Sequence, residues 1–217
     1  EMLRSLVGSE MCIRDRDEVR ELGIYPYFHA LESKQDTEVI MEGKRRIMLG
    51  SNNYLGLTTN PAVIQAGVDA YKALGSGCSG SRFLNGTLKL HLELEEELAK
   101  FLRKDAIVTF STGFQSNLGI ISAIVGMHDY VIMDRENHAS LYDGCRLSYG
   151  KMLRYRHNDM SDLEKKLQKV PDSCGCLIVT DGVFSMGGDI ANLPEICTLA
   201  RKYGARVMVC LLYTSPS

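Results

Sequence analysis

Residues 132–140 read IMDRENHAS, and residues 178–189 read IVTDGVFSMGGD. Each stretch begins as a short apolar strand and ends in small and polar residues just beyond it. In open α/β sheets, ligands bind in the crevice outside the carboxyl ends of the strands. We therefore expect the imidazole of His138, the hydroxyl of Ser185 and the glycine-rich turn after Ser185 to converge on one pocket, as in an enzyme.

Around these two stretches, short apolar segments alternate with segments of helical periodicity. Strands are expected at residues 46–50, 106–110, 130–133, 152–155, 176–180 and 205–209. Helices are expected at residues 61–74, 88–103, 114–125, 140–149, 159–168 and 193–203. Strands that alternate with helices, without alternating in polarity, indicate an α/β fold with a mostly parallel sheet that helices cover on both faces.

Composition narrows the class of protein. The 217 residues suffice for one large domain, and a net charge of −2 does not favour binding to nucleic acid or to an anionic membrane. No apolar run approaches the roughly 20 residues of a membrane-spanning helix. The cysteines lack paired metal-ligand spacing, and Cys174-Gly-Cys176 alone is better explained by a buried thiol. We expect a reducing, cytoplasmic context and no metal site.

The two ends of the chain read as translated sequencing adapter. The codons TGT CTC TTA TAC ACA TCT encode CLLYTS, which are residues 210–215, and they belong to the end sequence of transposase-based libraries. The opposite strand of the same oligonucleotide encodes EMCIRD, which are residues 10–15. We therefore expect residues 1–16 and 210–217 to be non-native. Residues 17–58 are expected to form an N-terminal arm with part of a small domain, and residues 59–209 the N-terminal portion of a large domain.

Two glycine-containing segments suggest ligand contacts. Residues 75–80 read GSGCSG and match a dinucleotide-binding fingerprint, but no strand precedes them and no helix opens inside them, so that interpretation is rejected. Residues 111–117 read STGFQSN and lie between an expected strand and an expected helix. Free N–H groups at a helix start bind anions. Thr112, Gly113 and Phe114 could therefore hold a phosphate, or could form an ordinary capped helix start.

Taken singly, each polar residue at the expected strand ends allows more than one role. His138 could cap a helix or border the core, or it could stack its ring on a planar cofactor. Asp181, Ser185 and Asp189 belong to residue types that are common in turns. Their arrangement favours a site, because successive expected strand ends each carry a distinctive polar group.

In combination, the motifs resemble those of the pyridoxal-phosphate-dependent α-oxoamine synthases. The motifs are SNNYLG at 51–56, GSRFLNGT at 80–87, FSTGF at 110–114, NHAS at 137–140, HND at 157–159 and DGVFSM at 181–186. The resemblance runs from about Tyr25 to Val209. It implies the aspartate-aminotransferase fold (fold type I), with pyridoxal 5′-phosphate (PLP) as the cofactor and residues 59–209 as a truncated PLP-binding domain. It also implies a homodimer whose active site lies at the subunit interface.

The resemblance implies roles for individual residues. His138 would stack on the pyridine ring, and Ser185 would form a hydrogen bond near the phenolic oxygen of the cofactor or the substrate carboxylate; these two are the expected catalytic residues. The phosphate contacts would come from Thr112, Gly113 and Phe114. Asn52 would lie near the amino-acid substrate, and the loop that contains Ser81 and Phe83 would approach the acyl thioester.

The chain departs from the family pattern in two places. Gly187 stands where the family usually has a carboxylate, although Asp189 follows. The family also follows the strand at 205–209 with an Asp-Asp-Ala-His-Gly-like segment and, much later, with the lysine that binds the cofactor covalently. Here Val209 is followed by Cys210 and Leu211. We therefore expect the chain as written to be inactive on its own.

The implied reaction condenses an amino acid, serine or glycine, with an acyl-CoA, usually with decarboxylation, to give an α-oxoamine. Apolar Phe83 argues against a charged acyl chain, and the motifs look most like those of the bacterial serine palmitoyltransferase branch. The glycine C-acetyltransferase and 8-amino-7-oxononanoate synthase branches stay open. A long acyl chain would allow peripheral contact with a membrane. The alternative from another class is a non-catalytic partner subunit of such an enzyme.

Overall fold

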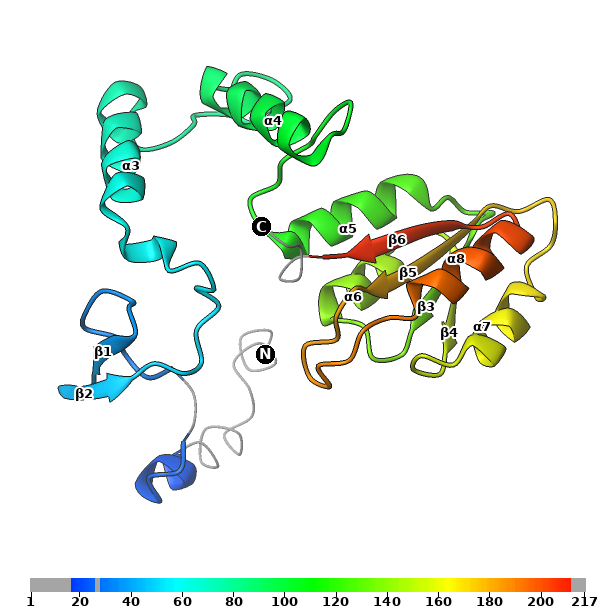
Figure 1. Ribbon diagram of the computed structural model, residues 1–217, viewed down its shortest axis with the longest axis horizontal. Helices are drawn as coiled ribbons and strands as arrows, with labels where there is room; N and C mark the ends of the chain where they lie inside the picture. Colours follow the sequence, from blue (N-terminus) through cyan, green and yellow to red (C-terminus); the bar gives the residue numbers. More distant parts are fainter. Residues whose placement is uncertain (1–16, 26–27, 212–217) are drawn as a thin grey trace, which may run out of the picture. The chain divides into compact units, whose positions relative to one another are not determined.

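The computed structural model describes residues 17–25 and 28–211. Contacts between residues divide the chain after Gly77 into two units, which are treated separately here (Figure 1). The sequence placed a boundary after residue 58 instead. Helix α3 (Pro61–Leu74) packs on the 3-10 helix η1 (Leu57–Thr59), so residues on both sides of position 58 belong to the first unit. Residues 1–16 and 212–217, most of the expected adapter-derived ends, lie outside the described residues.

The first unit contains a β-hairpin and a capped helix. Strands β1 (Glu38–Met41) and β2 (Lys44–Ile47) pair antiparallel, so the strand expected at 46–50 begins earlier and has a partner that the sequence did not reveal. Glu42 and Gly43 join them with φ angles of 51° and 68°, the left-handed values that a two-residue hairpin turn requires. Asn60 caps α3 by accepting from the Ala62 N–H at 2.9 Å. Pro61 occupies the first turn, as expected.

The second unit is built on a four-stranded parallel sheet. Its strands are β3 (Tyr130–Asp134), β4 (Lys151–Tyr155), β5 (Cys176–Asp181) and β6 (Arg206–Cys210), in the order β4-β3-β5-β6. Its helices are α4 (Lys89–Leu102), α5 (Gly113–Ile124), α6 (Ala139–Leu147), α7 (Met160–Leu167) and α8 (Leu193–Lys202). These bounds agree with the expected ones to within two residues, which confirms the alternating α/β pattern.

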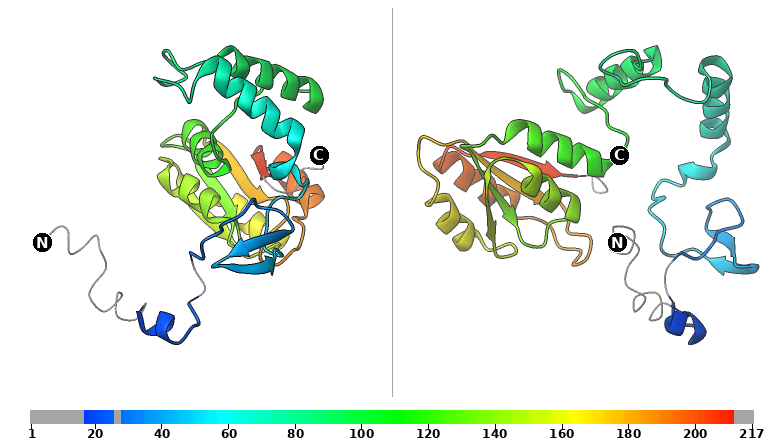
Figure 2. Two further views of the ribbon diagram at one scale, coloured as in Figure 1. Left: turned by 90° about the vertical axis from the view of Figure 1, so that its left-hand side faces the viewer. Right: turned by 180° about the vertical axis from the view of Figure 1, so that it is seen from behind.

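Side chains from both faces of the sheet are buried. Figures 1 and 2 show α5 and α6 on one face and α7 and α8 on the other. Ile132 and Ile178 pack toward α7 and α8, whereas their strand neighbours Val131 and Val179 pack toward α5 and α6. Successive residues of a strand point to opposite faces, so a strand covered on both sides needs apolar residues at every position. This burial explains the continuous apolar runs in the sequence.

The strand expected at residues 106–110 does not form. A strand needs a neighbouring backbone as hydrogen-bond partner, and within the described residues this segment pairs with no other strand. The N–H of Thr109 donates instead to the Glu95 carboxylate at 3.0 Å, and the side chain of Val108 is 73% exposed. The expectation that three strands, including this one, share a sheet is therefore wrong for this segment and correct for β3 and β5.

Strand β6 runs one residue into the expected adapter-derived end. Cys210 pairs with Asp181, and its side chain packs on the cluster beneath α5 and α6. The expectation that residues from 210 onward stay outside the sheet is wrong at this residue, because strand pairing uses backbone groups that nearly every residue type carries. Leu211 is 46% exposed. Across the described residues, no helix has the length and apolarity to span a membrane.

Candidate active site

Polar groups gather at one edge of the sheet. Because β3, β4 and β5 are parallel, their carboxyl ends at Asp134, Tyr155 and Asp181 face the same way. Helix α5 begins at this same end (Figure 1). His138 follows the end of β3, and Ser185 follows the end of β5. The structure thus brings the two expected strand-end groups and the start of α5 to one edge.

His138 is the N-cap of α6. Its Nδ1 accepts from the Ser140 N–H at 3.1 Å and lies 2.7 Å from the Ser140 hydroxyl. Its own N–H donates to the Asp181 carboxylate at 2.7 Å. His138 is exposed, and within the described residues its Nε2 makes no hydrogen bond. Burial raises the pKa of Asp181, and the hydrogen bond from the His138 N–H opposes that rise.

Two asparagines fix the surroundings of His138. The Asn137 side chain donates to the Val179 carbonyl at 2.9 Å and accepts from the Asp181 N–H at 3.0 Å, which clamps it to β5. The buried Asn117 of α5 donates to the Ser140 hydroxyl at 2.9 Å. Helices α5 and α6 are therefore linked through one hydroxyl. Neither asparagine was identified as functional from the sequence, although Asn137 opens the NHAS motif.

The start of α5 offers free donors. Thr112 caps the helix by accepting from the Gln115 N–H at 3.1 Å. Within the described residues, the N–H groups of Gly113 and Phe114 have no acceptor. Such groups, together with the helix dipole, suit an anion such as a phosphate. The three residues expected to contact phosphate thus form one exposed helix start, which fits that group.

Ser185 stands in a closed turn between β5 and α8. The Phe184 N–H donates to the Asp189 carbonyl at 2.9 Å, and the Gly188 N–H donates to the Phe184 carbonyl at 2.7 Å. Gly188 adopts a φ of 75°, which the turn requires and glycine accepts without strain. The Ser185 side chain is exposed, and its hydroxyl makes no hydrogen bond to the described residues. It is therefore free to meet a ligand.

A histidine that was given no role from the sequence ties this turn to the sheet. His157 places Nδ1 2.9 Å from the fully buried Asp134 carboxylate and Nε2 2.6 Å from the Asp189 carboxylate. The ring meets Phe184 edge-on at 4.4 Å. Burial lowers the pKa of His157, but the bonds to both carboxylates outweigh burial and raise it above its ordinary value. The HND motif directly after β4 was the signal available in the sequence.

The residues expected to meet substrate lie elsewhere in the chain. Asn52 is exposed in the first unit, between β2 and η1. Ser81 and Phe83 lie in the loop before α4, and Phe83 is 94% exposed. Arg82 holds this loop with two hydrogen bonds of 2.5 and 3.0 Å to Glu95. The roles of these residues toward substrate remain predictions.

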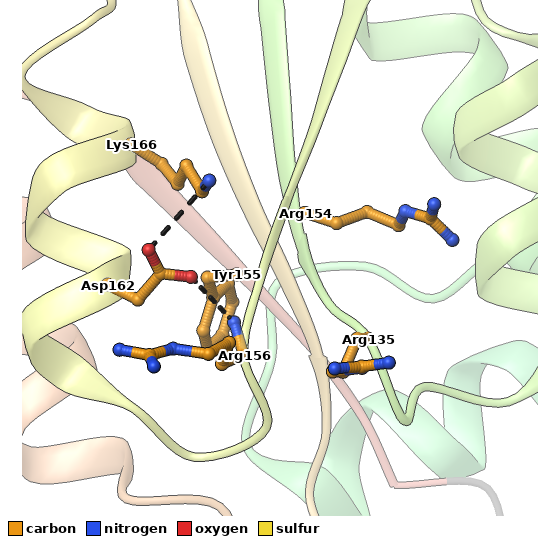
Figure 3. Close-up of a pocket in the computed structure, with 6 residues that line it drawn as sticks. All are labelled: Arg135, Arg154, Tyr155, Arg156, Asp162 and Lys166. Carbon is orange, nitrogen blue, oxygen red and sulfur yellow. Dashed lines mark hydrogen bonds and ion pairs between the residues drawn. The ribbon is translucent and has the colours of Figure 1, made fainter.

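A separate hollow of about 340 Å³ opens at the β4 edge. Figure 3 shows the side chains of Arg154 and Arg156 pointing to opposite sides of the strand. Asp162 accepts from the Arg156 N–H at 2.9 Å and lies 3.8 Å from the Lys166 ammonium. The arginine side chains that line the hollow thus point apart, and the Lys166 charge is partly neutralised by Asp162. The hollow therefore does not form a single binding site for an anion.

Comparison with known proteins identifies the family of the chain. Residues 44–214 match the family model described as Aminotransferase class I and II. The chain is 54% identical to a serine palmitoyltransferase of Sphingobacterium spiritivorum over 89% of the chain and 48% of that protein. It is 57% identical to the serine palmitoyltransferase of Bacteroides thetaiotaomicron, over 86% of the chain and 48% of that protein. It is also 44% identical to an 8-amino-7-oxononanoate synthase of Geobacter sulfurreducens, over 96% of the chain and 52% of that protein.

Solved structures show the same fold. A serine palmitoyltransferase of S. paucimobilis, solved as a variant with PLP and myriocin bound, superposes with a TM-score of 0.87 at 42% identity. The match covers 92% of this chain and 51% of that one. The chain thus spans about half the length of its relatives, and its fold is the truncated fold type I of PLP-dependent transferases, as expected. The resemblance to the α-oxoamine synthases is confirmed, and the chain belongs to the aminotransferase class I and II family.

Proposed function

We propose that this chain is part of a PLP-dependent acyltransferase that condenses serine or glycine with an acyl-CoA, usually with decarboxylation, to give an α-oxoamine. One observation carries the proposal: α5, which begins with free N–H groups, is joined to the exposed His138 by hydrogen bonds from Asn117 to Ser140 and between Ser140 and His138. That arrangement suits a planar, phosphorylated ligand. The serine palmitoyltransferase branch is favoured because two such relatives are 54% and 57% identical, against 44% for an 8-amino-7-oxononanoate synthase.

When bound, PLP supplies an electron sink for negative charge at the amino-acid Cα. The residues of this chain would hold and orient it. Thr112, Gly113 and Phe114 would bind the phosphate, and the His138 ring would lie against the pyridine ring. The Asp181 carboxylate holds the His138 backbone in place, and the Ser185 hydroxyl would donate to an oxygen of the cofactor or substrate.

The remaining assignments follow from the same proposal. The whole protein would act as a homodimer in the cytoplasm, with Asn52 near the amino acid and with Ser81 and Phe83 near the acyl group. The chain as written would bind the cofactor weakly and would not catalyse the condensation. A non-catalytic partner subunit is the less favoured alternative, because an exposed ring and a free helix start have no purpose in a scaffold.

A binding experiment tests the cofactor site. PLP and unphosphorylated pyridoxal would be titrated into the 217-residue chain, into His138→Ala and into the control His128→Ala, and binding followed by absorbance and fluorescence. We expect PLP to bind at least about tenfold more tightly than pyridoxal, because helix N–H groups and phosphate form charge-assisted hydrogen bonds. His138→Ala should weaken both ligands, and His128→Ala neither. Equal affinities for the two ligands, or no effect of His138→Ala, would contradict the proposal.

A further inference from the structure

The turn that carries Ser185 is anchored to the sheet by two adjacent residues. His157 reaches Asp189 in the turn and Asp134 at the end of β3, at 2.6 and 2.9 Å. Asn158 donates to the Ile190 carbonyl at 3.0 Å. Both residues lie just after β4, and His157 also contacts Asp134 at the end of β3. The turn between β5 and α8 is therefore held by groups that follow or end β4 and β3.

We infer that His157 is a positioning residue for the Ser185 turn, which it holds through simultaneous hydrogen bonds from both ring nitrogens to Asp134 and Asp189. Its part in catalysis rests on the function proposed above for Ser185. The anchor itself is a property of the folded chain and needs no ligand.

The chemistry of imidazole makes this anchor depend on protonation. A neutral ring has one N–H and one lone pair, so it can donate to only one of the two carboxylates. The imidazolium donates to both, and charge-assisted hydrogen bonds are roughly twice as strong as neutral ones. Asp134 and Asp189 are the charged groups that face the ring. The neighbouring Arg156 pairs with Asp159 at 2.7 Å.

Asn158 forms a second anchor, and its own amide groups do not titrate, although its side chain also donates to the Asp189 carboxylate at 3.3 Å. Its N–H donates to the Asp134 carboxylate at 2.9 Å, and its side-chain oxygen accepts from the Asn192 N–H at 3.1 Å. Its φ of 50° lies in the left-handed region, where asparagine is enriched among non-glycine residues. We expect this second anchor to keep the chain folded when His157 is replaced, so that the effect of His157 on the turn can be measured.

The sign of the pH effect follows from linkage. The pKa of His157 is raised in the folded chain above the ordinary value of 6.5. A group of this kind stabilises fully below its unfolded pKa and loses that contribution as the pH rises through its folded pKa. The turn should therefore be best ordered near pH 6 and should loosen at alkaline pH.

Amide hydrogen exchange of the 217-residue chain tests the inference without any ligand. The probes are the N–H groups of Phe184 and Gly188, corrected for intrinsic exchange, between pH 6 and 9. We expect their protection to fall about tenfold across this range, because the charge-assisted hydrogen bonds of the imidazolium are lost as it deprotonates. In His157→Gln the protection should be low and independent of pH, while His128→Gln should behave like the parent chain. In Asp189→Asn the imidazole ¹⁵N shifts of His157 should titrate at a lower pH than in the parent.

Three outcomes would overturn the inference. The first is protection of the Phe184 and Gly188 amides that does not vary with pH in the parent chain. The second is protection of these amides that is unchanged in His157→Gln. The third is an equal loss of protection at core amides of β3 and β5. The last would assign His157 to the whole sheet rather than to the turn. Because no cofactor is added, these results are independent of the PLP titration, and either proposal can fail while the other stands.

Discussion

The Glu95 carboxylate joins two segments on either side of α4. It accepts from Arg82 in the preceding loop, and from the N–H and hydroxyl of Thr109 at 3.0 and 2.7 Å. These hydrogen bonds lower the pKa of Glu95 to about 2. The bond from Arg82 has the largest effect, followed by those from Thr109. One side chain therefore determines the path of the loop that contains Phe83 and of the segment that leads to α5.

Glu95→Gln should release this connection. A carboxylate with a depressed pKa stabilises fully above its unfolded value, here 4.5, and loses that contribution as the pH falls through about 2. At pH 7 we expect faster amide exchange at Thr109 in Glu95→Gln, and no change in Glu97→Gln. In the parent chain, Thr109 protection should decline only between about pH 4.5 and 2. A Glu95 carboxyl ¹³C shift that titrates near 4.5 would contradict this prediction.

Asn117 is the buried link between α5 and α6. Asn117→Ala removes the side chain that donates to the Ser140 hydroxyl. This hydroxyl then keeps only its contact with the His138 ring. Loss of a buried hydrogen-bonding partner costs about 1–3 kcal/mol. Urea unfolding should show a loss of this size, and the exposed Gln115→Ala in the same helix should change the free energy of unfolding little. A difference below about 0.5 kcal/mol would mean that the link contributes little.

At the scale of elements, α5 and α6 pack closely because of Gly144. A Cβ at this position would lie 2.9 Å from the Ile121 side chain and 3.0 Å from the Asn117 carbonyl oxygen. Gly144→Ala should therefore destabilise the second unit by about 1–3 kcal/mol, the usual cost of overpacking. Gly67→Ala in α3 is the matched control, since nothing lies within 4 Å of its Cβ position. It should stabilise its helix by roughly 0.5–1 kcal/mol. Equal effects of the two substitutions, measured by urea unfolding, would refute the packing argument.

The sequence predicted elements better than it predicted contacts. Continuous apolar runs identified β3 and β5 because both of their faces are buried. The same pattern failed at residues 106–110, since a strand also needs a partner and local sequence does not name one. Likewise, His157 and Asp189 lie 32 positions apart, so their contact exists only after the sheet has formed. The strand-end rule placed His138 and Ser185 at one edge but could not reveal which groups hold them there.

At the scale of the whole molecule, the positions of the lysines bear on activity. In the described residues, several lysines lie on helices and pair with carboxylates, such as Lys100 with Glu96 and Lys202 with Glu164. We therefore expect that borohydride treatment of the chain with PLP fixes no stoichiometric amount of cofactor on one lysine, and that acyl-CoA with serine or glycine releases no CoA. Peptide mapping and a thiol assay check these outcomes. Specific labelling of one lysine together with CoA release would overturn the proposal that the chain is inactive alone.

The strand order β4-β3-β5-β6 also leads to an expectation for the order of folding events. Paired residues of β3 and β4, Tyr130 and Lys151, are 21 positions apart (151 − 130), whereas Tyr130 and Cys176 of β5 are 46 apart (176 − 130). Closing the longer loop costs about 0.7 kcal/mol more chain entropy. Leu177 of β5 and Arg206 of β6 are 29 positions apart (206 − 177). By the same argument, we expect β3 to pair with β4, and β5 with β6, before β5 pairs with β3. Substitutions at the contact between β3 and β4 should then slow folding, whereas substitutions at the contact between β3 and β5 should mainly accelerate unfolding.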